Sequence, residues 1–151
     1  MSETAEQSAG RGVKAPPSLL YLVKRTELVV RARLEEVLKP AGVTALQYTA
    51  LTVLERHDSL TAAQLARDSF VTAQSVADMV RTLEARGHVV RHPNPDNRRE
   101  LLISLTELGR RLLADYEEPV RDLERRMTDG LTPEQHVHLR AGLDHAWRRL
   151  L

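Results

Sequence analysis

Apolar positions in the middle of the chain recur first with a helical period and then with a strand-like one. Thr61 is followed three residues later by Gln64, a spacing typical of a helix start in which each side chain binds the other residue's backbone. We therefore expect a short helix from Thr61 to about Ser69. Thr72 can cap a second helix to about Arg86, because apolar residues recur there every three or four positions. These residues are Val76, Met79, Val80 and Leu83.

Two strand-like runs follow the helix pair. Residues 88–92 and 101–105 are mainly β-branched or aliphatic, which predicts short strands. Residues 93–99 between them contain two prolines and two asparagines, which indicates a turn. Helix, turn, helix and hairpin in this order predict a mainly α fold, a winged helix-turn-helix with a small β-hairpin wing. Such a module can place its second helix in a DNA major groove and its wing along the adjacent minor groove.

Longer helical patterns flank this module. The expected helices span residues 18–38, about 44–56, about 106–129 and from 132 to the C-terminus. The apolar stripes on the first and the last two are broader than contact with one neighbour requires. In the last helix, the residues expected to be buried are Leu139, Leu143, Trp147 and Leu150. An intertwined homodimer is the simplest arrangement that buries these stripes, and a monomer whose outer helices pack only on each other is the alternative.

The predicted division of the chain follows from these elements. Residues 1–17 are polar and end in two prolines, so we expect a flexible N-terminal tail. Residues 18–40 and 106–151 are expected to form a helical dimerisation region. Residues 44–105 are expected to form the winged helix-turn-helix domain.

The distribution of charge along the chain, rather than its total, indicates the class of partner. The chain has a formal net charge of only +1. Residues 81–99 contain five arginines against one glutamate and one aspartate, a local excess that attracts phosphate backbones. A solvated surface is the ordinary explanation of an arginine run, but here the run coincides with a DNA-reading pattern.

Several other functions lack a basis in the sequence. Cysteine is absent, which excludes disulfides, thiolate metal sites and cysteine redox sensors. We find no catalytic motif and no metal-ligand spacing among the six histidines, so we predict a protein that is not an enzyme and has neither cofactor nor metal. No apolar run is long enough to span a membrane and no secretory signal is visible, which predicts a cytoplasmic protein without a membrane partner.

The combined motifs resemble the MarR family of transcription regulators. The resemblance is carried by residues 75–87 (SVADMVRTLEARG), 89–91 (VVR), 94–99 (NPDNRR) and 105–109 (LTELG). They fit a family pattern of LExxGxVxR, an Asp-x-Arg wing and LTxxG, with Asn97 in place of the usual wing aspartate. The resemblance implies a homodimeric DNA-binding regulator, with repression favoured, on a pseudo-palindromic operator in double-stranded DNA. A winged helix that binds another protein is the alternative.

Candidate site residues follow from the module and from the resemblance. For the recognition helix they are Thr72, Gln74, Ser75, Asp78 and Arg81, and for the wing they are Asp96, Asn97, Arg98 and Arg99. Gln74 can pair bidentately with adenine. Asp78 can accept from a cytosine amine or orient Arg81, and Asp96 can pair with a wing arginine. The resemblance also implies a small, commonly phenolic, effector between the two lobes, for which the candidate residues are Arg31, Tyr48 and His57.

Overall fold

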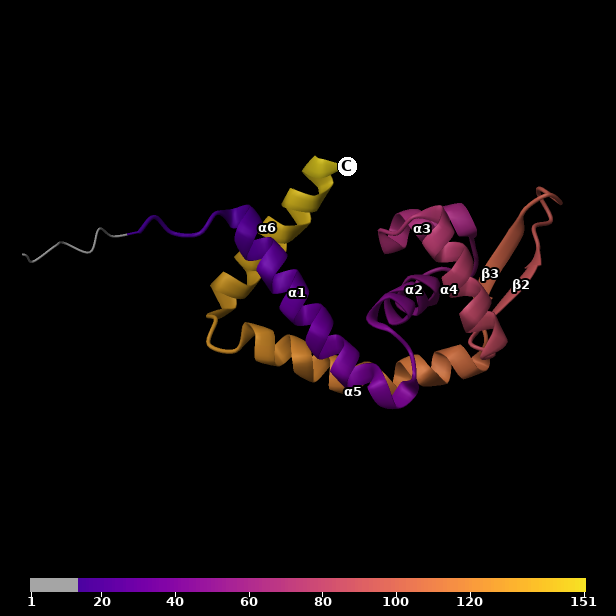
Figure 1. Ribbon diagram of the computed structural model, residues 1–151, viewed down its shortest axis with the longest axis horizontal. Coiled ribbons are helices and arrows are strands. Elements are labelled where there is room, and N and C mark those ends of the chain that lie inside the picture. The colour runs from indigo at the N-terminus through magenta and orange to yellow at the C-terminus, as the bar shows by residue number, and fades with distance from the viewer. Residues whose placement is uncertain (1–13) are drawn as a thin grey trace, which may run out of the picture.

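The computed structural model describes residues 14–151 and shows a mainly helical chain with a small β-hairpin projecting at one end (Figure 1). Its elements are α1 (Leu19–Leu38), the 3₁₀ helix η1 (Lys39–Ala41), α2 (Ala45–Glu55), β1 (Leu60–Thr61), α3 (Ala62–Ser69), α4 (Ala73–Ala85), β2 (Val89–Pro93), β3 (Leu101–Leu105), α5 (Glu107–Thr128) and α6 (Pro133–Leu150). The winged helix-turn-helix is confirmed. Of the predicted tail, residues 1–13 lie outside the described residues, and residues 14–17 are exposed without regular structure.

Local chemistry sets the helix boundaries. Thr44, Thr61 and Thr132 each form a complete capping box with a glutamine three residues later. These caps satisfy backbone groups that the first helical turn leaves without partners. Gly87 follows α4 with φ 79°, a left-handed conformation in which a residue without Cβ is favoured. The chain can therefore turn sharply from α4 into the wing.

The sheet has three antiparallel strands in the order β1-β3-β2. In β3, Ile103 pairs with Leu60 of β1 on one side and with Arg91 of β2 on the other. The turn between β2 and β3 begins at residue 94, one residue later than predicted, because Pro93 still pairs with Leu101 as the last residue of β2. Proline is tolerated there because β2 is an edge strand and needs no further backbone donor.

One core lies inside the winged-helix lobe. Its fully buried side chains come from the end of α1 and from α2, α3, α4 and β3, and they are Leu38, Leu51, Val53, Leu54, Leu65, Val76, Leu83 and Ile103. The first turns of α5 add Leu112 and Leu113. Full burial of such a side chain is worth about 1.5–3 kcal/mol relative to exposure. This core therefore fixes α4 and the wing on a common support.

The outer helices contrast with this lobe. Among the described residues α6 has no buried residue, and α1 has only Leu38. The prediction that Leu139, Leu143, Trp147 and Leu150 are buried is wrong for one chain, because each is at least 40% exposed. The physical reason is that α6 turns back from α5 toward the winged-helix lobe (Figure 1) and meets it around an open cavity rather than in a packed interface. None of the described helices is long and apolar enough to cross a membrane.

Candidate nucleic-acid interface

The N-terminal half of α4 exposes the polar residues predicted for base recognition. The Thr72 hydroxyl accepts a hydrogen bond from the Ser75 backbone N–H at 3.1 Å and lies 3.0 Å from the Ser75 hydroxyl. Thr72 therefore acts as the helix cap, as predicted. Val76, Met79 and Val80 hold the opposite face of the helix in the core. The exposed face is consequently presented in a fixed orientation.

Asp78 organises the rest of this face. Its carboxylate accepts from the Gln74 side-chain amide at 3.4 Å and from the Arg81 guanidinium at 3.3 Å. Asp78 and Arg81 are thus in contact, and that Asp78 orients Arg81 for DNA stays a prediction. All three side chains are exposed, so the pairs are weak and can rearrange toward a ligand.

Asparagine side chains shape the wing tip. Asn94 Oδ1 accepts from the Asp96 backbone N–H at 3.0 Å, and Asn97 Oδ1 accepts from the Arg99 backbone N–H at 3.2 Å. These are local turns of the kind that Asn favours. The tip therefore has a defined backbone without any charged pair.

The expected ion pair of Asp96 with a wing arginine is wrong for the free protein. Within residues 14–151, neither Arg98 nor Arg99 has a carboxylate oxygen within 4.0 Å. The side chain of Asp96 is exposed at the tip, while its backbone serves the Asn94 turn. Asn97 accepts from the backbone N–H of Arg99. Because the Asn97 side chain is neutral, it forms no ion pair with the Arg99 guanidinium.

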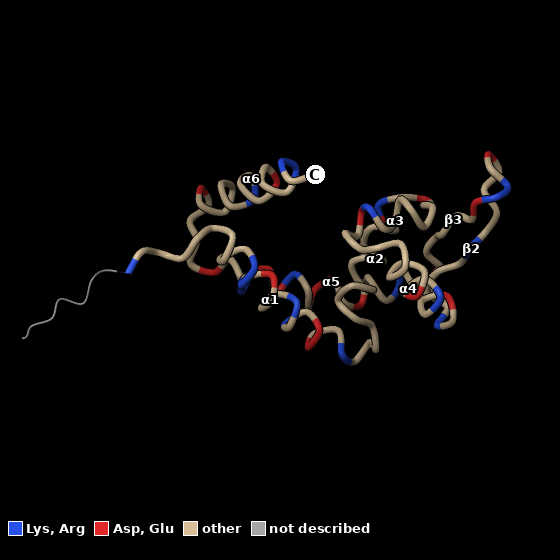
Figure 2. Tube along the Cα trace, turned by 45° about the horizontal axis from the view of Figure 1, so that its top comes forward, with Lys and Arg blue, Asp and Glu red and all other residues tan. Residues whose placement is uncertain are grey.

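The other arginines of residues 81–99 are engaged within the protein. Arg91 of β2 forms an ion pair with Glu84 of α4, which raises the pKa of Arg91. Arg86 donates to the Gly42 carbonyl. The basic side chains of this segment that have no carboxylate partner thus lie at the wing tip, where Figure 2 shows basic and acidic positions next to each other.

A groove joins the helix to the wing. It has a volume of about 370 Å³ and is lined by Ala77, Val80 and Arg81 of α4, by Arg91, Arg99, Glu100, Leu101 and Ile103 of the wing and its strands, and by Thr61, Ala62 and Ala63. Three arginines and Glu100 therefore line one concave surface. Arg81 and Arg91 are paired with Asp78 and Glu84, so Arg99 is the arginine of this groove that has no carboxylate partner and can bind a backbone phosphate bidentately.

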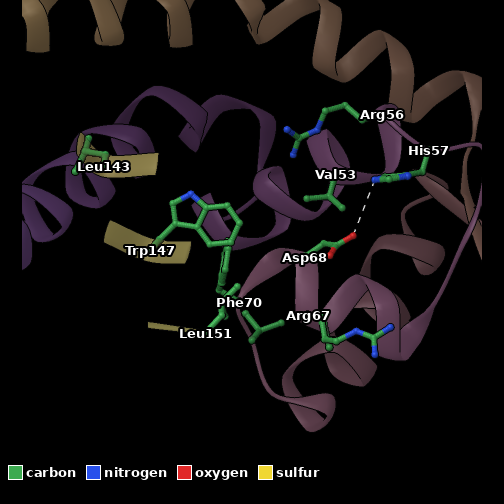
Figure 3. Close-up of a pocket in the computed structure, with 11 residues that line it drawn as sticks. Val53, Arg56, His57, Arg67, Asp68, Phe70, Leu143, Trp147 and Leu151 are labelled. Atoms are coloured by element: carbon green, nitrogen blue, oxygen red, sulfur yellow. Dashed lines mark ion pairs between the residues drawn. The ribbon is translucent and has the colours of Figure 1, made fainter. Parts of the chain in front are cut away.

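The three predicted effector residues do not come together. Tyr48 is buried in the core, where burial raises its pKa. Arg31 forms an ion pair with Glu27 on α1. Of the three, only His57 lines the large open cavity between α6 and the winged-helix lobe (Figure 3). There, His57 Nε2 lies 3.9 Å from Asp68 Oδ2.

That cavity contains residues that the sequence did not single out. It has a volume of about 1230 Å³, and its walls include Arg56, Phe70, Leu143 and Trp147. Phe70 is the residue in the described chain that adopts a positive φ, 58°, without being glycine. Such a conformation costs roughly 1–2 kcal/mol for an ordinary residue. The signal available in the sequence was an aromatic residue at a tight helix-helix turn, which glycine ordinarily occupies.

Comparison with known proteins decides the family. A family model described as the MarR family matches residues 41–100. The HTH-type transcriptional repressor Rv2887 of Mycobacterium tuberculosis is 32% identical over 133 residues, which cover 88% of this chain and 96% of that protein. The chain belongs to the MarR family.

Solved structures of MarR-family proteins share the fold as well. The apo form of MarR from Escherichia coli has a TM-score of 0.77 at 26% identity and covers 87% of this chain and 98% of its own. The transcriptional repressor CouR, bound to a 23-mer DNA duplex, has a TM-score of 0.79 at 27% identity and covers 85% of this chain and 92% of its own. The shared fold therefore extends well beyond the winged-helix lobe of this MarR-family chain.

Proposed function

We propose that this protein is a DNA-binding transcriptional repressor that binds a pseudo-palindromic operator as a homodimer. The observation that carries the proposal is the groove between α4 and the wing, which Arg81, Arg91 and Arg99 line beside an exposed polar helix face. A relative named as a repressor and a similar structure bound to DNA support the same function.

Each predicted site residue has a role in this proposal. Gln74 and Ser75 read base edges in the major groove, because they lie on the exposed face near the N-terminus of α4. Thr72 caps the helix, and Asp78 orients Arg81. Arg98 and Arg99 bind phosphates or enter the minor groove. Asn97, together with the turn that includes Asp96, holds the backbone of the wing tip.

The uncovered apolar faces of the outer helices support the homodimer. Exposed apolar side chains line both ends of the chain, namely Leu19, Leu20, Leu22, Val23, Leu28 and Val29 on α1 and Val137, Leu139, Leu143, Trp147 and Leu150 on α6. Contiguous patches of this kind mark interaction surfaces. A second copy offers the same surfaces and buries both sets at once.

A protein-binding winged helix is less well supported. Residues 94–100 at the wing tip consist of polar, charged and proline residues. Protein interfaces are instead built around apolar or aromatic anchors. The tip is therefore better suited to phosphates than to a protein surface.

We also propose that a small aromatic effector, such as a phenolic acid, releases the operator. The cavity beside α6 supports this role, because it combines the aromatic Phe70 and Trp147 with the cationic Arg56 and with His57. Of the candidate residues, His57 remains in this proposal. Titration with hydroxybenzoates should quench Trp147, the single tryptophan of the chain, and lower the affinity for DNA.

Selection of binding sites from a random duplex pool tests DNA binding and its symmetry together. A two-fold dimer presents two copies of α4 to successive major grooves, so the selected sites should be inverted repeats of roughly 16–20 base pairs with half-site centres about 10 base pairs apart. Inserting about 5 base pairs between the halves turns one half to the opposite face and should abolish tight binding. Recovery of direct repeats, or of no sequence at all, would contradict the proposal.

A further inference from the structure

Phe70 is an aromatic residue in a backbone conformation that favours glycine. It ends α3 with φ 58° and ψ 41°, and its backbone N–H donates to the carbonyl groups of Ala66 and Arg67. Only Val71 separates it from Thr72, the cap of α4. A bulky residue in this conformation persists only where its surroundings favour it.

The side chain of Phe70 gains nothing from the core of its own lobe. It is 68% exposed and projects toward α6. There it meets Trp147 edge to face, with ring centroids 5.8 Å apart and an interplanar angle of 76° (Figure 3). This geometry is one of the favourable arrangements for an aromatic pair.

Trp147 is held in place by its own helix. Its indole N–H donates to Asp144 Oδ1 at 3.2 Å, and the Arg148 guanidinium lies 4.8 Å from the ring centroid. Asp144 also accepts from Arg148 at 3.0 Å. These contacts orient the indole toward the α3–α4 turn before any ligand binds.

We propose that the Phe70–Trp147 contact couples the dimerisation helix α6 to the turn that aims α4, so that Phe70 is a positioning residue for operator binding. The inference rests on the proposed function. The turn directly precedes the cap of α4, and α4 is fixed in the core of the lobe by Val76, Val80 and Leu83. A contact that holds the turn against α6 therefore sets how the lobe, and α4 with it, is oriented relative to α6. Through Trp147, the orientation of α4 is tied to the helices that join the two copies.

Replacing Phe70 by glycine separates coupling from a purely local role. Glycine removes the backbone strain and also the ring. If Phe70 served only the turn, F70G would keep or raise thermal stability and leave operator affinity unchanged. If Phe70 couples α6 to α4, F70G keeps or raises stability and yet weakens binding to the two-half-site operator.

The experiment uses the full chain, the operator obtained by site selection, and a set of operators with altered half-site spacing. F70G and W147L should each lower operator affinity about 3- to 10-fold, the range expected from one aromatic pair. Both should also reduce the preference for the selected spacing. The double variant should lose no more than either single variant, because both remove the same contact. F70Y keeps the ring and should restore the wild-type affinity to within about twofold.

Fluorescence gives a readout that does not depend on DNA. Trp147 is the single tryptophan, so its emission should change in F70G and stay unchanged in F70Y. L46A is the matched control, because Leu46 is also a partly exposed apolar residue of the lobe and does not line the cavity. It should alter neither emission nor affinity.

Failure of the inference is distinguishable from failure of the proposed function. Wild-type operator affinity together with wild-type emission in F70G would overturn the coupling while leaving DNA binding intact. If the wild-type chain selects no DNA, the proposed function fails, and hydrogen exchange then decides the coupling. W147L must in that case speed exchange of the Val71 N–H, which donates to the Ala66 carbonyl at 3.1 Å, and unchanged exchange would overturn the inference.

Discussion

The winged-helix lobe and the outer helices are built from similar apolar residues, but only the lobe buries them within one chain. Leu51, Leu65 and Leu83 of the lobe are 0% exposed, whereas Leu143 and Leu150 of α6 are 47% and 85% exposed. The lobe is therefore a complete folding unit with its own core. We expect the outer helices to form one half of a core whose stability depends on a second copy.

The largest expected effect comes from adding charge to the uncovered face of α6. L139E/L143E places two carboxylates at partly exposed apolar positions on the same side of the helix. Because a buried unpaired charge is costly, we expect loss of the dimer and an operator affinity lowered more than about 100-fold. Sedimentation and DNA titration measure the two losses.

The matched control adds the same charge to polar positions of the same helix. H138E/H145E should keep both the dimer and DNA binding, since neither residue belongs to the apolar face. If both pairs of substitutions reduced dimerisation and operator affinity equally, α6 would be sensitive to added charge on any face. That result would contradict the assignment of the apolar face of α6 to the dimer interface.

The next largest effect concerns the wing, which the lobe supports but does not bury. R98A/R99A removes the two arginines without a carboxylate partner and should preserve the fold and the dimer. Operator and non-operator DNA should both bind more weakly, and the slope of log affinity against log salt should fall by about one for each lost phosphate contact. K24A/K39A removes the same charge from α1 and η1, away from the wing, and should leave the slope unchanged. An unchanged slope in R98A/R99A would remove the wing from the interface.

A smaller effect on operator affinity is expected from Gln74, because this residue is proposed to contact a base rather than a phosphate. Q74A should relax base preference within each half-site by about 1–3 kcal/mol if the contact with adenine is bidentate. Non-operator affinity and its salt dependence should stay at wild-type values. Competition with single-base operator variants measures this, and an undiminished preference would assign base reading to other residues of α4.

The smallest expected effect tests the neutral residue at the wing tip. N97D keeps the oxygen that accepts from the Arg99 N–H but adds a carboxylate beside two free arginines. Pairing should compete with phosphate, so we expect affinity for any DNA to fall about two- to fivefold, within the range of one exposed ion pair. Tighter binding by N97D would show that the arginines need a charged partner to be oriented.

Most of the fold was accessible from local signals in the sequence. The capping threonines and the apolar period of three and four gave the helix boundaries, and the asparagines and prolines gave the wing turn. What buries the apolar stripes of the outer helices could not be predicted in the same way. Periodicity indicates that one face of a helix is buried, but not whether the same chain or a second copy buries it. Trp147 illustrates this limit, since it was expected to be buried and is 40% exposed in one protomer.

The site was predictable as a set of residues but less so as a set of contacts. Gln74, Asp78 and Arg81 share a helix, so their spacing of three and four brings them together. The pairing of Arg91 with Glu84 and the unpaired state of Arg98 and Arg99 depend on how the hairpin meets α4. The residue types of Arg31, Tyr48 and His57 suit an aromatic effector, but the sequence does not show whether they lie near one another. In the structure, His57 lines the cavity, whereas Arg31 and Tyr48 do not. The role of Phe70 could not be predicted from the sequence, because it depends on a left-handed backbone conformation that phenylalanine rarely adopts.

Sedimentation equilibrium of the full chain at tens of micromolar tests most directly the claim that the lobe is complete in one chain and the outer helices are not. Burial of both apolar faces by a second copy predicts a particle of about 34 kDa, twice the 17.0 kDa of one chain. A single species of 17.0 kDa that still unfolds cooperatively would contradict the account, since α1 and α6 would then be stable with their apolar residues in water.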